Sequence, residues 1–400
     1  MLGLAHASGG VIKHISSYHA ELSKIRRDLH ANPELGFEEV RTGGIVAGEL
    51  QAYKVDHIQR GLGKTGVVAV IKGKTNRSGK TIGLRADMDA LPMTEENEFD
   101  HISATKGLMH GCGHDGHTTM LLGAAKYLAA TRNFDGTVHC IFQPGEEGYA
   151  GARAMIQDGL FDQFPCDTIY AMHNWPNMPP GKIGITPGAA MAAADRVTIT
   201  INGRGGHGAH AYHSVDPVVI AAQVITALQT IVSRNVSPIE SAVISICALH
   251  AGNLNAMSVI PRQAQLVGTV RTFNSAIQDM VEQRIKAIAS GIAQAMGGSA
   301  DINYERIYPA TINSAAEASF AAATAEELIG AENVVRDLPP SMGAEDFSFM
   351  LQVRPGAYLR IGQGGTEGCF LHNTKYDFND AIIPLGSALF ARLAERSLPQ

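Results

Sequence analysis

The stretch GTVHCIFQPGEEG, residues 136–148, joins a short apolar run to a loop that carries two adjacent glutamates. The run is bounded by Gly136 and Pro144, which predicts a strand that ends in a loop. Further along, ARAMIQDGLF (152–161) predicts a helix, and DTIYAMHNWP (167–176) predicts a second strand that ends in a loop. Because a strand–helix–strand order favours parallel pairing, the sequence predicts a parallel sheet with helices on its faces.

The same alternation extends in both directions from this stretch. On the N-terminal side the sequence predicts a helix from about Ile15 that stops at Pro33, strands over 65–73 and 80–92, and a helix over 118–131. From about Ala315 onward it predicts a helix over 319–330, a strand over 356–364 and a helix over 388–397. This pattern predicts an α/β domain with a mostly parallel sheet covered by helices.

The pattern changes near Asp195. A strand that alternates as a half-exposed strand does (196–205) precedes a helix, two strands, a helix and a strand, over 216–234, 242–252, 264–273, 277–296 and 300–308. This β-α-β-β-α-β succession is the ferredoxin-like order. We therefore predict a catalytic domain made of 1–194 and 310–400, interrupted by an inserted α+β domain over 195–309. One face of its antiparallel sheet could stay exposed and pair with another subunit.

Composition limits the class of partner and the compartment. The 32 basic and 38 acidic residues give a net charge of −6 without a run of one sign, which argues against nucleic acid or anionic membranes as partners. Five irregularly spaced cysteines favour a reducing cytoplasm over a disulfide framework. The start, MLGLAHASGG, lacks the basic region of a signal peptide. We expect no apolar stretch near the roughly 18 residues of a membrane span.

Metal-ligating residue types follow the predicted strands. LMHGCGHDGHTTM, residues 108–120, holds one cysteine and three histidines, and further candidates follow later strands at Glu146, Glu147, His173 and His372. Because the carboxyl ends of parallel strands meet at one rim, we expect one mixed S/N/O set, formed by Cys112, His114, Glu147, His173 and His372. Such a set suits a zinc-like ion, or two ions that share a bridging ligand.

Several of these residues have a second interpretation. Cys112 could be a buried apolar residue, or a nucleophile activated by His114, but a nucleophile would leave the two glutamates without a role. His117 lies one helical turn past His114 and is either a ligand or a helix-start histidine bonded to a carboxylate. Of the two glutamates, one would bind metal and the other would act as general base. Asp87 and Asp89 would orient ligating histidines, or form a solvated turn.

Ordered motifs along nearly the whole chain resemble the metal-dependent aminoacylase/carboxypeptidase amidohydrolases. The branch that the chain resembles contains hippurate hydrolase and the plant indole-3-acetyl-amino-acid hydrolases. The motifs are RRDLHANPELGFEE, LRADMDALP, MHGCGHDGHTTMLLGAA, FQPGEEG, AMHNWP, GRGGHGAH, VDPVV, GTVRTF, MGAEDFSFM and LHNTKYDFND. This resemblance implies an inserted lid and dimerisation domain, and a homo-oligomer, dimer or tetramer, formed through it.

The resemblance also implies residue roles. Its five metal ligands fall on Cys112, His114, Glu147, His173 and His372, its catalytic base on Glu146, and supporting roles on Asp87 and Asp89. His207, from the inserted domain, would stabilise the oxyanion, and Arg271 would hold the substrate carboxylate. This chain departs from the usual pattern of the branch at His210-Ala211-Tyr212, at Ser258 and at the short insertion NLNAM.

The function that we expect is metal-dependent hydrolysis of the amide bond of N-acyl amino acids such as hippurate. Two divalent ions per subunit are implied. Ligand softness favours Zn²⁺, relatives suggest Mn²⁺, and Co²⁺ or Ni²⁺ would be substitutes. A dipeptidase or an N-carbamoyl-amino-acid hydrolase would use the same two-metal centre. A non-catalytic metal-binding protein would have no use for a glutamate that stays unligated beside a ligand.

Overall fold

The chain divides into two compact units. The computed structural model describes residues 10–365 and 369–400, so the expectation about a signal peptide, which concerns the first residues, lies mostly outside them. One unit runs up to Ala190 and includes Ile312–Pro339 and the chain from Asp346 onward. The other unit comprises Met191–Thr311 and Pro340–Glu345. The second unit is thus inserted into the sequence of the first.

The first unit is built on an eight-stranded sheet of order β1-β2-β4-β3-β5-β16-β6-β15. The strands are β1 (His57–Leu62), β2 (Gly66–Lys72), β3 (Thr81–Asp87), β4 (Thr137–Gln143), β5 (Thr168–Pro176), β6 (Ile183–Gly184), β15 (Val334–Val335) and β16 (Gly356–Gly364). The central strands β4, β3, β5 and β16 pair in parallel, whereas β2 and β6 pair antiparallel with their inner neighbours. The predicted mostly parallel α/β sheet is confirmed. The margins of the sheet differ from that prediction: β1 and β2 are joined by a short turn and pair antiparallel, and β2 and β6 run antiparallel to their inner neighbours.

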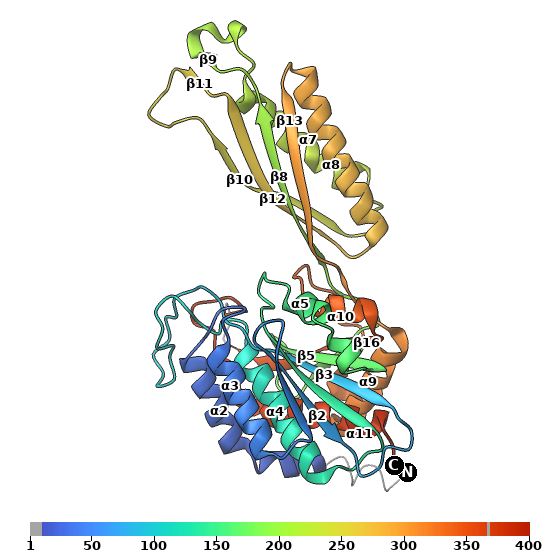
Figure 1. Cartoon of the computed structure of the whole chain (residues 1–400). Coiled ribbons are helices and arrows are strands. Elements are labelled where there is room, and N and C mark those ends of the chain that lie inside the picture. The colour runs from blue at the N-terminus through green and yellow to red at the C-terminus, as the bar shows by residue number, and fades with distance from the viewer. Residues whose placement is uncertain (1–9, 366–368) are drawn as a thin grey trace. The chain divides into compact units, whose positions relative to one another are not determined.

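Helices cover both faces of this sheet (Figure 1). One face of the sheet is covered by α2 (His19–Ala31), α3 (Val40–Ala52), α4 (His114–Thr131), α9 (Ala315–Ile329) and α11 (Ile383–Ser397). The other face carries α5 (Gly151–Gln157) and α10 (Phe347–Val353), with α6 (Leu160–Gln163) beside α5. The helix predicted over 118–131 begins at His114, which places that histidine in the first turn of α4.

The second unit has the predicted ferredoxin-like order. Its elements are β8 (Ala193–Asn202), α7 (Pro217–Arg234), β10 (Ala242–Ala251), β12 (Gln263–Thr272), α8 (Ser275–Ala295) and β13 (Ser299–Tyr308). The strands pair antiparallel in the order β10-β12-β8-β13, and α7 and α8 bury their apolar sides against one face. The remaining short elements are β7 (Gly188–Met191), β9 (Gly206–His207), η1 (Gly208–His213), β11 (Val259–Ile260), β14 (Thr311–Asn313), η2 (Ala331–Asn333) and η3 (Asp380–Ile382).

Helix α7 corrects one sequence expectation. Its 18 residues have a mean hydropathy of 1.3, so in length and composition it matches a membrane span, although no such stretch was expected. The apolar side of α7, which includes Ile220, Val224, Leu228 and Ile231, packs into the core of the second unit. A helix that packs on a sheet in this way has the same length and composition as a short span.

Candidate metal centre

The candidate ligands of the first unit come together at the carboxyl ends of its central strands. Asp87 ends β3, Glu146 and Glu147 follow β4, and His173 lies near the end of β5. Cys112 and His114 lie at the start of α4, and His372 follows β16. The rim where parallel strands end is the usual ligand crevice of an open α/β sheet. The arrangement joins segments from five parts of the chain.

Among the described residues of the first unit, ligand atoms of four triads lie within 4.8 Å of one another. The triads are Cys112/His114/His173, Cys112/Glu147/His372, His114/Glu146/Glu147 and Asp87/His114/His117. Cys112 Sγ lies 3.4 Å from His173 Nε2, and His372 Nε2 lies 3.1 Å from Glu147 Oε1. Two triads share Cys112, so the donor set has enough ligand atoms for two neighbouring ions.

His114 provides the test of whether these residues fit a metal. Its Nδ1 lies 3.2 Å from the Asp89 carboxylate, which suits an N–H donor. Its Nε2 is buried, and in the described part of the chain this atom has no hydrogen-bond partner. A buried ring nitrogen without a partner is costly unless an ion takes the lone pair, and a carboxylate behind the histidine is usual at metal sites. The residues therefore fit a bound cation.

The other two histidines are oriented by the backbone. His173 Nδ1 lies 2.6 Å from the carbonyl oxygen of Asn174, which leaves Nε2 facing Cys112. His372 has a φ of +63°, in the left-handed region that is uncommon for a side-chain-bearing residue. Its backbone N–H donates to the Gly111 carbonyl at 2.8 Å and so ties the segment to the loop of Cys112. Backbone strain of this kind is common at functional sites.

Glycine is required at one position of this loop. Gly113 has a φ of +95°, and a Cβ there would lie 2.5 Å from both Asn174 Oδ1 and Tyr376 Oη. Only glycine combines that backbone conformation with such close approach. Gly113 thus lets the chain turn sharply between Cys112 and His114.

The adjacent glutamates have different surroundings. The Glu147 side chain faces His372, and its backbone N–H donates to Asp89 at 2.9 Å. Glu146 is buried, and its Oε1 lies 3.4 Å from the backbone nitrogen of Asp346. Because their contacts differ, the two carboxylates are suited to different roles in one site.

His117 is fully buried and forms a triad with Asp87 and His114. Its Nδ1 lies 2.6 Å from Asp87, and its Nε2 lies 2.6 Å from Asn174 Oδ1. Both ring nitrogens therefore have close polar partners, as in the interpretation of His117 as a helix-start histidine bonded to a carboxylate. Asp87 also pairs with the buried Arg85 at 2.7 Å, and Arg85 continues to Asp346 at 3.1 Å.

Negatively charged groups dominate the electrostatics of this site. Hydrogen bonds to Cys112 and Glu147 raise the pKa of His372 to about 10. Burial lowers the pKa of His114, but Asp87 and Cys112 outweigh it and hold that pKa well above its usual value. Burial and the charge of Glu147 raise the pKa of the Cys112 thiol. Protonated histidines thus balance the acidic groups, and a cation would replace those protons.

Two predicted site residues, His207 and Arg271, belong to the second unit. The exposed His207 precedes η1, and its Nδ1 accepts the backbone N–H of Ala209 at 3.1 Å. The half-buried Arg271 lies on β12, and its Nε donates to Thr269 Oγ1 at 3.1 Å. Burial lowers the pKa of the Arg271 guanidinium. The triads described above lie in the first unit, apart in sequence from both residues.

A buried charge network behind the metal residues was missed in the sequence. Arg26 on α2 contacts Asp115 at 3.5 Å, Asp377 at 2.8 Å and Asp380 at 2.6 Å. His30, one turn along α2, lies 2.8 Å from Asp115. The sequence does carry one sign of this network, because Arg26 and His30 lie on the side of α2 that also carries Leu22 and Leu29. Charged residues on an apolar helix side are buried only when they have partners.

These features define an α/β unit that carries a candidate metal centre, with a second α+β unit inserted in its sequence. The model of peptidase family M20/M25/M40 matches residues 83–396. The chain belongs to this family.

Named relatives match almost the whole chain. Hippurate hydrolase of Campylobacter jejuni is 42% identical over 388 residues, which cover 97% of this chain and 99% of the relative. N-acetylcysteine deacetylase of Bacillus subtilis is 38% identical over 379 residues, covering 94% and 97%. Among solved structures, the dinuclear metal-binding M20 peptidase YXEP of Bacillus subtilis is 35% identical with a TM-score of 0.83, covering 96% of this chain and 99% of that one. These relatives confirm the expected branch, and a two-metal centre characterises the family.

Proposed function

We propose that this protein hydrolyses the amide bond of N-acyl amino acids, giving a carboxylic acid and a free amino acid. The observation that carries the proposal is the pair of adjacent glutamates with different contacts, one of which faces His372 while the other is buried beside the ligand triads. A structural metal site needs no second carboxylate. The hippurate hydrolase and the deacetylase among the relatives support this substrate class.

The metal ligands in this proposal are Cys112, His114, Glu147, His173 and His372. When bound, two divalent ions would polarise the substrate carbonyl and lower the pKa of water. A thiolate with three imidazoles favours Zn²⁺ on ligand softness, with Mn²⁺ as the second candidate. Asp89 would support His114 and Glu147 by the hydrogen bonds described above, and Asp87 would do the same for His117.

Glu146 is the general base in this proposal. Its carboxylate would take a proton from the attacking water as the C–O bond forms, and would later give that proton to the amine nitrogen as the C–N bond of the tetrahedral intermediate breaks. His207 would stabilise the oxyanion. The Ala209 N–H occupies Nδ1 of His207, which favours the neutral tautomer with a proton on Nε2 as donor. Arg271 would hold the substrate carboxylate through its guanidinium fork.

The variant Glu146→Gln tests this function. Amide and carboxylate have nearly the same shape, so we expect unchanged metal content and a fall in kcat by a factor of roughly 10² to 10⁴. Metal content and the hydrolysis of a panel of N-acyl amino acids are measured on the same samples. The matched control is Glu96→Gln, since Glu96 lies in the same unit and its carboxylate bonds only to Thr374 among the described side chains. Near-normal turnover in Glu146→Gln would remove Glu146 from the mechanism.

A second candidate function is a dipeptidase or an N-carbamoyl-amino-acid hydrolase. Both would use the same ligands and base, and two hydantoinase/carbamoylase-family amidases share the fold at 14% and 16% identity. Release of ammonia and carbon dioxide from N-carbamoyl amino acids, faster than release of amino acid from N-acyl substrates, would favour the carbamoyl hydrolase.

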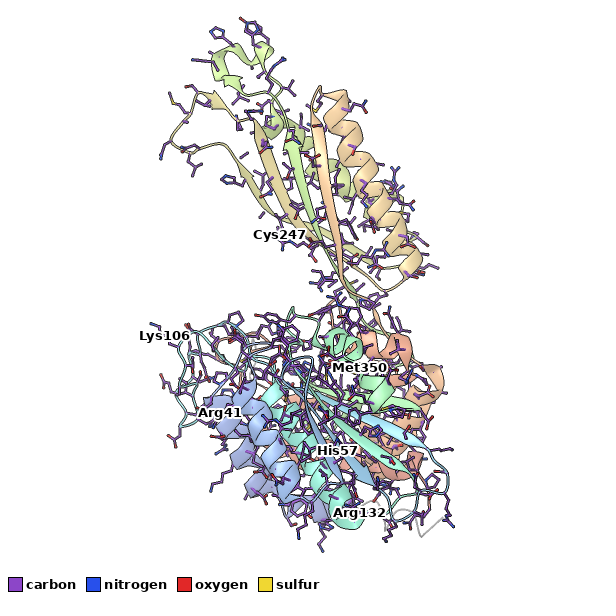
Figure 2. All side chains as sticks on the ribbon, viewed as in Figure 1. Arg41, His57, Lys106, Arg132, Cys247 and Met350 are labelled. Atoms are coloured by element: carbon purple, nitrogen blue, oxygen red, sulfur yellow. The ribbon has the colours of Figure 1, made fainter. Side chains whose placement is uncertain are left out.

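We also propose that the second unit forms a homo-oligomer through its sheet. Strand β10 lies at the sheet edge and carries the exposed Leu249. Cys247, two residues earlier on the same strand, is also exposed (Figure 2). A long exposed edge strand can pair with a second copy. We expect Leu249→Lys to convert the oligomer to a monomer in light scattering, and Leu254→Lys, in a loop of the same unit, to leave it intact. A monomeric wild-type protein would exclude this proposal.

All five cysteines are free, which supports a cytoplasmic location.

A further inference from the structure

The segment 34–39, between α2 and α3, contacts two loops of the candidate metal centre and has no role in the function proposed above. The Glu34 carbonyl oxygen accepts the backbone N–H of Ala90 at 2.8 Å, in the loop after β3. Glu39 Oε1 accepts the backbone N–H of Gly145 at 2.7 Å, in the loop after β4. These two loops carry acidic residues of the centre, namely Asp89, Glu146 and Glu147.

The side chain of Glu39 points away from the helix that it precedes. Glu39 is the residue before α3, but its carboxyl group caps none of the helix N–H groups. The Glu34 carboxylate instead accepts the N–H groups of Arg41 at 3.0 Å and Thr42 at 2.7 Å. An acidic side chain at a helix start usually accepts the free N–H groups there. The bond from Glu39 to Gly145 therefore needs an explanation other than helix capping.

The burial of Glu39 costs free energy. Glu39 is 0% exposed, and no ion pair among the described residues includes it. Burial raises the pKa of this carboxyl to about 7, so both protonation states are populated near neutral pH. In either state one oxygen can accept the Gly145 N–H, while the other lies 2.5 Å from Thr65 Oγ1. A buried carboxyl group without a cation is costly, and such groups cluster at functional sites.

The backbone of Glu146 is held on both sides by buried carboxyl groups. Glu39 accepts the N–H of the preceding residue, Gly145. Asp89 accepts the N–H of the following residue, Glu147, at 2.9 Å. A general base must lie within hydrogen-bond reach of the proton that it takes, and a displacement of about 1 Å can cost about 100-fold in rate. The two bonds therefore act on the residue whose position matters most for proton transfer.

We propose that Glu39 is a positioning residue for the general base, because its hydrogen bond to Gly145 fixes the backbone from which the Glu146 carboxylate reaches the attacking water. This inference rests on the proposed function. Loss of the bond should slow proton transfer and so lower kcat. Metal content and KM should persist, because Glu147 stays tied to Asp89 and the other candidate ligands come from other segments.

The variants Glu39→Gln and Glu39→Met test this role. The Gln amide keeps an oxygen for the Gly145 N–H and an N–H donor for Thr65, whereas Met has a similar length and no acceptor. We expect Glu39→Met to lower kcat roughly 10- to 100-fold with little change in KM, and Glu39→Gln to retain near-normal kcat. Metal content is measured on the same samples. Normal kcat in Glu39→Met, or an equal loss in both variants, would overturn the proposal.

Asp135→Leu is the matched control for a general loss of stability. Asp135 is also buried and accepts the backbone N–H groups of Arg77 and Ser78, each at 2.9 Å. It lies just before β4 begins, whereas Gly145 follows the end of that strand. Asp135→Leu should lower the thermal midpoint and leave kcat unchanged. An equal fall of kcat in Asp135→Leu would assign the effect of Glu39→Met to stability and overturn the proposal.

Two further measurements keep the test decisive. If Glu39→Met does not fold, Glu39→Asp takes its place, because it keeps the charge but is one methylene shorter and should lower kcat. Hydrogen–deuterium exchange of residues 143–151 needs no turnover and should be faster in Glu39→Met or Glu39→Asp than in Glu39→Gln. Equal exchange in these variants would contradict the role of Glu39 alone. A wild-type protein that cleaves no N-acyl amino acid would contradict the proposed function instead.

Discussion

Asp89 shows at the level of one residue how a single side chain can position two residues of the candidate metal centre. One carboxylate oxygen lies 3.2 Å from His114 Nδ1, and the other accepts the backbone N–H of Glu147 at 2.9 Å. The same carboxylate therefore orients two candidate ligands from different parts of the chain. Carboxylates in this position raise the basicity of the histidine and fix its ring.

We expect Asp89→Asn to lower the affinity for metal about 10- to 100-fold, because the amide neither accepts as strongly nor fixes both partners. Titration of the metal-free protein with Zn²⁺ or Mn²⁺ measures this affinity. Asp167→Asn is the control, since Asp167 accepts the Thr81 N–H where β3 begins, far along that strand from Asp87. Equal affinity in Asp89→Asn and wild type would show that Asp89 is only structural.

At the scale of elements, Arg26 joins α2 to two other segments. It is 1% exposed and pairs with Asp115 in the first turn of α4 and with Asp377 and Asp380 beyond His372. Removing one partner from a buried ionic network leaves unpaired charges in a poorly solvated place. The network thus holds together two segments that carry candidate ligands.

Arg26→Ala should lower the free energy of unfolding of the first unit by roughly 3–5 kcal/mol, because three carboxylates lose the buried guanidinium that they share. Urea unfolding followed by tryptophan emission reports this unit, which contains Trp175. The neighbouring Arg27 is the control: its side chain is 55% exposed and pairs with Asp380 alone. Arg27→Ala should cost no more than about 1 kcal/mol. Similar losses in both variants would contradict a special role for Arg26.

For the whole molecule, the buried His30 links stability to pH. Burial lowers its pKa, but hydrogen bonds to Asp115 and Glu95 outweigh burial and raise that pKa to about 9. A histidine whose pKa is raised on folding stabilises the folded state fully below its unfolded pKa of ~6.5. That contribution is lost as the pH rises through about 9.

The thermal midpoint of the wild-type protein should therefore fall between neutral pH and pH ~10 more steeply than that of His30→Gln. Calorimetry across this range measures both slopes, and His57→Gln, at the surface strand β1, provides a control that should keep the wild-type slope. Parallel slopes for wild type and His30→Gln would mean that His30 is not charged in the folded protein.

The sequence by itself determined the classes of both units and the residue types of the centre. Alternation of strands and helices predicted the parallel sheet, because apolar periodicity is a local property of the chain. Strand ends followed by Glu146, Glu147 and His173 predicted a common rim, because parallel strands end on the same side. The length of β2 and the order of strands and helices in the inserted unit could likewise be predicted from the local sequence pattern.

Only the tertiary structure decided which side chains meet. Arg26 and His30 lie more than 80 residues before Asp115 and over 340 before Asp377 and Asp380, so no local pattern could pair them. The partners of Asp89, the partners of His117 and the contact between Trp175 and Phe370 depend on packing between distant segments in the same way. Local sequence specifies each element through its own backbone and apolar spacing, whereas a site depends on distances that exist only after the elements pack.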